Sequence, residues 1–210
     1  MDTPETAKLA QDGRVWLRGA LPDGEVAELR SLADGEGGPG ARFGPRSALF
    51  RAIDESSLNA TLRTHWPKAR LSRLVSFNKS ETANWQLPWH QDRVIAMDAR
   101  IEDPRYQRWS CKAGIWHCEP PLEVLESMLF LRLHLDDAGP EDGAMEIALG
   151  SHLLGRVSKA DAGAAASRCA TEVTTARAGD VLVLSMLILH RSARSGRTKD
   201  RRVLRADYTA

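Results

Sequence analysis

The second half of the chain alternates short apolar segments with turn-forming clusters, and this pattern limits the possible folds most strongly. The expected strands cover residues 128–135, 144–149, 181–189 and 202–208, the last with a period of two. Turn clusters separate them at residues 136–143 and 178–180. Short strands with such spacing are typical of a β-sandwich or jelly roll. We therefore expect a mainly β core.

The first third of the chain has helical spacing instead. Val26, Leu29, Leu32 and Ala33 repeat at the helical period, and a second helix is expected at residues 55–66, before Pro67. Further expectations are a strand at residues 71–77, a long irregular excursion at 100–116 and a helix at 159–170. No linker interrupts the chain. We expect a single domain over residues 1–210, with a helical part at about 1–68 and a β core at about 70–210.

Charge and cysteine content narrow the class of protein. The 29 basic and 28 acidic residues give a net charge of +1, which provides no electrostatic footprint for nucleic acid or an anionic membrane. Three cysteines argue against a disulfide framework. The N-terminus lacks signal-peptide character, and the longest apolar run is too short for a membrane helix. We expect a cytoplasmic protein, a monomer or homodimer, acting on a small molecule.

A histidine and an aspartate two positions apart are the main chemical signal. His90 and Asp92 would point to the same side of an extended segment, and both could reach one metal ion. His190, at the end of the apolar run, is the candidate third ligand. Two histidines and a carboxylate form the facial triad of non-haem iron(II) oxygenases, which leaves three coordination positions open. The His-x-Asp triplet alone is weak, because it also occurs in solvated turns.

A basic residue strengthens the interpretation. Arg201 follows His190 by eleven positions and could hold the far carboxylate of a 2-oxo acid bidentately. Ser192 could donate a hydrogen bond to the same carboxylate. The alternative is that Arg201 belongs to a solvated basic face, since arginines are frequent between residues 191 and 205.

At these residues the sequence resembles the phytanoyl-CoA dioxygenase family of Fe(II)/2-oxoglutarate oxygenases. The resemblance covers most of the chain, in ordered pieces at residues 12–21, 77–79, 88–92, 135–137, 142–152, 179–192 and 201–205. It implies a double-stranded β-helix (jelly roll, cupin-like) with flanking helices, and Fe(II), 2-oxoglutarate and O2 as cofactor and co-substrates. By position, His90, Asp92 and His190 match the metal ligands, while Arg201 and Ser192 match the co-substrate residues.

Asp92 bears on the outcome of the reaction. Halogenating relatives replace this carboxylate with a small residue, which frees a site for chloride. Because the carboxylate is retained here, the resemblance favours hydroxylation of a small organic molecule, with 2-oxoglutarate converted to succinate and CO2.

Other residues are weaker candidates. Trp85 either packs in the core or forms a wall of the co-substrate pocket, and Asn78 ends a strand near it or lies in a plain turn. Arg132 and His134 share one face of a strand where relatives often have apolar residues, which suggests an anionic or hydrogen-bonding substrate. Trp116 would lie on a loop that closes over substrate or packs at the surface. A zinc site at Cys111, His117 and Cys118 lacks a fourth ligand.

Two rival functions remain open. One is a zinc or manganese hydrolase or isomerase on a similar barrel, using the same three ligands. The other is a non-catalytic pseudo-enzyme that binds a small acid. Arg201 argues against the first, because a hydrolase has no 2-oxo acid to hold. The intact ligand set argues against the second.

Overall fold

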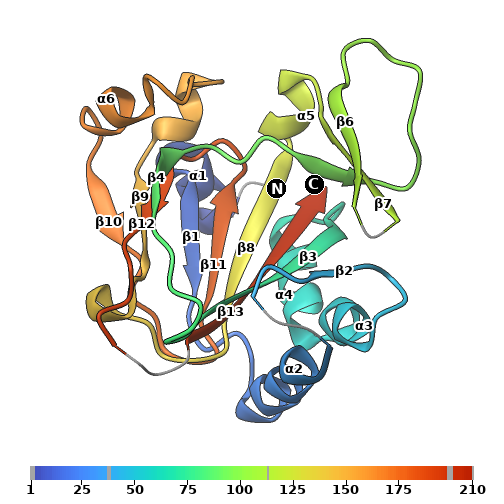
Figure 1. Ribbon diagram of the computed structural model, residues 1–210, viewed down its shortest axis with the longest axis vertical. Coiled ribbons are helices and arrows are strands. Elements are labelled where there is room, and N and C mark those ends of the chain that lie inside the picture. Colours follow the sequence, from blue (N-terminus) through green and yellow to red (C-terminus); the bar gives the residue numbers. More distant parts are fainter. Residues whose placement is uncertain (1–2, 37–38, 113, 198–200, 210) are drawn as a thin grey trace.

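The computed structural model describes residues 3–36, 39–112, 114–197 and 201–209. Its core consists of two antiparallel sheets, and the helices formed by residues 4–65 cover the outer face of the larger one (Figure 1). The larger sheet has the order β1 (Arg14–Leu17), β11 (Val181–Ser185), β8 (Met128–His134), β13 (Arg201–Thr209), β3 (Arg70–Lys79) and β2 (Arg42–Phe43). The smaller sheet has the order β10 (Thr171–Val173), β9 (Met145–Ala148), β12 (His190–Ser192) and β4 (Leu87–His90). This is the expected double-stranded β-helix.

A third sheet and several helices surround this core. The small sheet has the order β5 (Ile95–Met97), β7 (Ile115–Glu119) and β6 (Gln107–Lys112). The helices are α1 (Pro4–Asp12), α2 (Asp23–Glu36), α3 (Ala48–Glu55), α4 (Ser57–His65), α5 (Leu122–Glu126) and α6 (Ala162–Ala166), with short 3-10 turns η1 (Pro140–Asp142) and η2 (Ser151–Leu154). Within the described part of the chain, none of these helices is long and apolar enough to cross a membrane.

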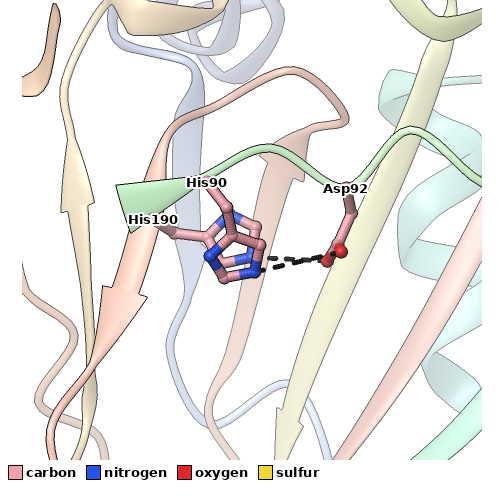
Figure 2. A group of neighbouring side chains, drawn as sticks. All are labelled: His90, Asp92 and His190. Carbon is pink, nitrogen blue, oxygen red and sulfur yellow. Dashed lines mark ion pairs between the residues drawn. The ribbon is translucent and has the colours of Figure 1, made fainter. Parts of the chain in front are cut away.

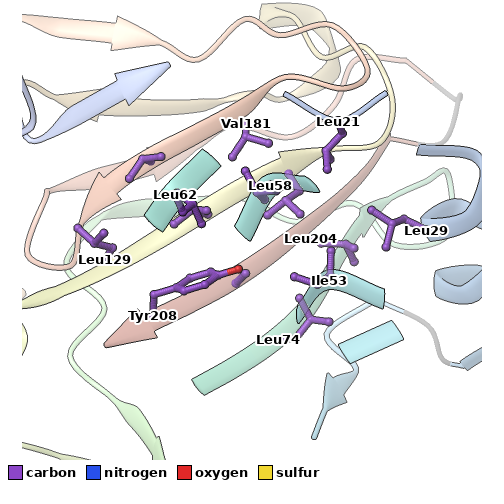
Figure 3. Close-up of a cluster of buried hydrophobic side chains, with 14 of the residues drawn as sticks. Leu21, Leu29, Ile53, Leu58, Leu62, Leu74, Leu129, Val181, Leu204 and Tyr208 are labelled. Carbon is purple, nitrogen blue, oxygen red and sulfur yellow. The ribbon is translucent and has the colours of Figure 1, made fainter. Parts of the chain in front are cut away.

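The two faces of the larger sheet bury different residues, because side chains alternate along each strand. On the outer face, Leu204 and Tyr208 pack against Ile53, Leu58 and other residues of the helices (Figure 3). On the inner face, Phe130 and Leu184 pack against Met145 and Ile147 of the smaller sheet. The helices therefore stabilise the larger sheet from outside and leave the space between the sheets for a site.

The helix expected at residues 55–66 is confirmed as α4, but α3 before it was not expected; extended backbone at Ser56 separates the two helices. The single strand expected at residues 181–189 is wrong. β11 ends at Ser185, Ile188 donates a backbone hydrogen bond to the Ser185 carbonyl in a turn, and His190 begins β12 in the other sheet. The apolar run does not reveal this turn, since the turn itself is buried.

Two further expectations need correction. The region expected to be irregular at residues 100–116 contains β6, and β6 and β7 pair as an antiparallel hairpin. The alanine-rich stretch at residues 159–170 is helical only over Ala162–Ala166.

Candidate metal centre

Strand pairing brings the two histidines together. His90 at the end of β4 lies directly opposite His190 at the start of β12. Side chains directly opposite each other in an antiparallel pair are close neighbours. Their ring centroids are 4.3 Å apart, and both rings are directed toward Asp92 (Figure 2). Ligand atoms of His90, Asp92 and His190 all lie within 4.8 Å of one another.

Gln91 fixes the backbone between the two candidate ligands His90 and Asp92. Its side-chain amide donates hydrogen bonds to the Gly155 and Leu187 carbonyls at 2.8 and 2.7 Å, and its oxygen accepts from the Val157 amide at 2.9 Å. This anchor holds His90 and Asp92 although Asp92 lies beyond the end of β4. The sequence interpretation did not use Gln91, whose only signal was its place between the two ligands.

Backbone contacts orient the imidazoles for metal binding. Nδ1 of His90 lies 2.7 Å from the Pro88 carbonyl, and Nδ1 of His190 lies 3.0 Å from the Ile188 carbonyl. A carbonyl only accepts, so each Nδ1 carries a proton, and it is Nε2 that is left for a metal ion in the neutral ring. Desolvation and the neighbouring His190 lower the pKa of His90, which favours its neutral, ligating form.

A buried chain of ion pairs supports the carboxylate. Arg205 contacts Asp92 and donates to Asp207 at 2.6 Å, and Asp207 also accepts from Arg73 at 2.6 Å. Desolvation alone would raise the pKa of Asp92, but the Arg205 charge, with the neighbouring His190 and His90, holds that pKa well below its ordinary value. Asp92 is therefore ionised and ready to bind a cation. Sequence reasoning missed the role of Arg205, although the period of two placed it on one face with Arg201.

The triad opens into a cavity of about 290 Å³ between the sheets. Its polar lining is mainly cationic: besides the triad it includes Lys79, Arg132, Arg201 and Arg205. Arg201 is 2% exposed, and its Nη1 donates to the Gly143 carbonyl at 2.8 Å. Burial lowers the pKa of Arg201 to about 10, which leaves it charged at neutral pH. No partner for its Nε lies among the described residues.

Arg132 is the least satisfied of these cations. It is buried, and it forms no hydrogen bond or ion pair with any residue that the structure describes. Its guanidinium carbon lies 5.2 Å from the centroid of the Phe77 ring. Burial and the nearby Arg201 and Arg205 charges lower the pKa of Arg132 to about 9. A buried guanidinium without an acceptor is costly, so this arrangement fits a cavity that receives an anion.

Of the remaining candidate site residues, two line the cavity and three do not. Ser192 and Trp85 line the cavity, and the Trp85 ring lies 6.3 Å from that of Phe77. His134 is 2% exposed beside Trp16, and Trp116 packs edge-on against Trp109. Asn78, His134 and Trp116 do not line this cavity. Their proposed contacts with substrate or co-substrate stay predictions.

The donor set fits a facial-triad metal. Two imidazole nitrogens and one ionised carboxylate surround a shared point that faces the cavity. The triad is the only cluster of three or more potential ligands among the described residues, so Cys111, His117 and Cys118, which the sequence did not favour as a zinc site, do not form such a cluster.

A family model matches residues 9–203, almost the whole chain, and its description is phytanoyl-CoA dioxygenase (PhyH). The chain belongs to this family. No curated protein matches it significantly.

Several solved structures share the fold of this PhyH-family chain. The epimerase SnoN from nogalamycin biosynthesis, in complex with Fe3+, alpha ketoglutarate and nogalamycin RO, is 22% identical with a TM-score of 0.69, over 97% of this chain and 81% of that one. EctD from S. alaskensis is 17% identical with a TM-score of 0.69, over 100% and 77%. HygX from Streptomyces hygroscopicus, with nickel and 2-oxoglutarate bound, is 16% identical with a TM-score of 0.64, over 100% and 87%.

Proposed function

We propose that this protein is an Fe(II)- and 2-oxoglutarate-dependent dioxygenase that hydroxylates a small organic molecule. The observation that carries the proposal is the facial triad at the rim of a cavity that contains two buried arginines, Arg132 and Arg201, without carboxylate partners among the described residues. The solved relatives add support, since SnoN and HygX were crystallised with alpha ketoglutarate or 2-oxoglutarate and a metal. We propose that the whole chain forms one such domain.

Each residue of the site has a defined task. His90, Asp92 and His190 would hold the iron, with the proton of each histidine kept at Nδ1 by a backbone carbonyl. Arg201 would bind the far carboxylate of 2-oxoglutarate with help from Ser192, and Arg132 would add a second guanidinium. Trp85 and Phe77 would exclude water beside it. When bound, the iron supplies the dioxygen chemistry that converts 2-oxoglutarate to succinate and CO2 and oxidises the substrate.

The arginine pair also weighs against the rival functions. A hydrolase or isomerase that uses the same three ligands needs no dianionic co-substrate, and the two buried guanidinium groups would then have no anion to balance their charge. A binding protein without catalysis would not need an intact ligand set. Hydroxylation itself is the finer part of the proposal, because SnoN is an epimerase and SnoK a carbocyclase on the same fold.

The test is a mass-spectrometric substrate screen with Fe(II), ascorbate and 2-oxoglutarate. We expect succinate from 2-oxoglutarate and a gain of one oxygen in the substrate. Asp92→Ala should abolish succinate formation, whereas Asp23→Ala, at an exposed aspartate at the start of α2, should retain it. Succinate formation by Asp92→Ala at the wild-type rate would overturn the proposal. Substrate loss of two hydrogens without added oxygen would retain the co-substrate but reject hydroxylation.

A further inference from the structure

A second, larger hollow lies at the other end of the same two strands. It has a volume of about 840 Å³, within the range of small-molecule sites. Its lining includes Arg73 near the start of β3 and Thr209 at the end of β13, whereas the triad cavity uses Lys79 and Arg201 at their opposite ends. We call this hollow the β3–β7 groove, because β5, β7 and the β2–α3 segment form its other walls.

The ion-pair chain joins this groove to the metal centre. Arg73 lines the groove and binds Asp207, Asp207 binds Arg205, and Arg205 contacts Asp92. Asp92 is also close enough to Arg73 for its charge to raise the pKa of that arginine, although desolvation lowers this pKa overall. The groove therefore lies on the Asp92 side of the metal centre, beyond this ion-pair chain and away from the Arg201 end of the cavity.

The groove combines apolar walls with a cationic rim. Phe43, Met97 and Ile115 contribute apolar surface. At the rim, Arg42 and Arg46 form no ion pair with a carboxylate in the described ranges, while Asp98 is the acid among the lining residues. The charge of Arg73 is already balanced by Asp207 at 2.6 Å. Arg42 and Arg46 are exposed and need no fixed partner, but together with Asp98 they leave the rim with a net positive charge, which attracts an anionic group to the edge of an apolar site.

His117 adds a hydrogen-bond acceptor to the groove lining. The side chain is 2% exposed, and its Nδ1 lies 2.9 Å from the Ile115 carbonyl, which requires the proton on Nδ1. Its Nε2 is buried and has no partner among the residues that the structure covers. Burial, with smaller effects from Arg73 and Arg42, lowers the pKa of His117 and keeps the ring neutral. A buried acceptor without a donor implies a ligand hydroxyl or N–H.

We propose that the β3–β7 groove binds the substrate, and that this substrate is an organic anion with an apolar body and a hydrogen-bond donor. The anionic group lies at Arg42 and Arg46, the donor reaches His117, and the apolar body leads toward Asp92. This inference rests on the proposed function for the oxidation of the bound molecule. The binding preference itself follows from the groove alone.

The test uses three probes with one apolar body: 2-naphthoate, 2-naphthylmethanol and 2-naphthylmethylammonium. Isothermal titration calorimetry is carried out with saturating Ni(II) and 2-oxoglutarate, so that the Arg201 cavity does not compete for the carboxylate. We expect 2-naphthoate to bind at least about tenfold more tightly than the other two, or about 1.4 kcal/mol. 6-Hydroxy-2-naphthoate should bind more tightly still, and His117→Phe should remove this additional gain.

A matched pair of double variants locates the binding. Arg42→Gln/Arg46→Gln should weaken 2-naphthoate binding about tenfold, equivalent to about 1.4 kcal/mol. Lys159→Gln/Arg168→Gln removes the same charge at exposed positions around α6 and should leave the affinity unchanged. Equal affinity of the three probes, or equal weakening by both double variants, would overturn the inference. Succinate formation by the wild type separates the two proposals: its absence rejects the oxygenase, whereas succinate without the anion preference rejects only the groove assignment.

Discussion

Replacing Arg205 with methionine should destabilise the protein through the buried ion-pair chain. The Arg205 side chain is 4% exposed, and it contacts Asp92 and, at 2.6 Å, Asp207. Removing one partner of a buried pair typically costs about 3–5 kcal/mol. Two features place the expected loss of unfolding free energy near the lower end of this range, about 3 kcal/mol. Asp207 keeps its contact with Arg73, and the Asp92 side chain is 35% exposed, so solvent screens its charge.

Thermal and urea unfolding of the metal-free protein would measure this loss. A change of about 3 kcal/mol should lower Tm by roughly 6–12 °C for a chain of this length. With an m value of about 2–3 kcal/mol/M, the urea midpoint should fall by about 1 M. Saturating Ni(II) should reduce the difference between wild type and Arg205→Met, because the bound cation replaces part of the charge that Asp92 loses.

A double-mutant cycle with Asp207 tests the cause. Asp207→Asn should cost less in the Arg205→Met background than in the wild type, by about 1–2 kcal/mol, because the two residues share one ion pair. Additive effects within about 0.5 kcal/mol would refute the reasoning. Arg202→Met is the matched control, since Arg202 faces the other side of β13 and pairs with Asp136 and the exposed Asp34. It should show no coupling to Asp207.

Three further predictions concern the cavity. Arg132→Met should raise the unfolding free energy by about 1 kcal/mol or more, because it removes an unpaired buried charge. The same variant should bind 2-oxoglutarate about tenfold more weakly in calorimetry, and an unchanged affinity would exclude Arg132 from the co-substrate site. Gly143→Ala should lower the free energy of unfolding in urea by about 2–3 kcal/mol, because a Cβ would meet the Ala193 carbonyl oxygen at 2.7 Å. Gly19→Ala is the control: Gly19 has a similar φ of +61° but open space around it, so the loss should be only about 1 kcal/mol. Burial lowers the pKa of Lys79 from 10.5 to about 8, and the charges of Arg201 and Arg132 add smaller effects in the same direction. Between these values the unfolded chain binds more protons, so stability should rise with pH there, and Lys79→Met should flatten that rise; an unchanged slope would contradict the shift.

The parts of the site that sequence could predict depend on local geometry. His90 and Asp92 lie two positions apart, and a local alternation of side chains is enough to bring them to one side. The strand positions at residues 128–135 and 202–208 were also predictable, because β8 and β13 have strong apolar or alternating patterns. The apolar run before it and then the resemblance to the family indicated His190 as the third ligand, but the strand register that places it opposite His90 is not local and was not predicted.

The parts that could not be predicted depend on long-range register or on buried turns. Residues 186–189 are as apolar and as buried as β11, so their composition does not distinguish a turn from a strand. Arg205 reaches Asp92 only because β13 lies between β8 and β3 and faces the β4 side of the barrel. Neither fact leaves a signal in the neighbouring sequence.

The basic run after His190 shows how the fold separates residues that look alike in sequence. Arg191 and Arg197 are at the surface and pair with Glu146 and Glu141, as a solvated face would require. Arg201 and Arg205 alternate onto the inner face of β13 and are 2% and 3% exposed. A solvated arginine needs no partner, whereas a buried one must have an acceptor or a ligand. Arg205 has two carboxylates and is structural in the free protein. Arg201 has one carbonyl and a free Nε among the described contacts, and it is therefore the arginine of this run whose charge is left for an anion to balance.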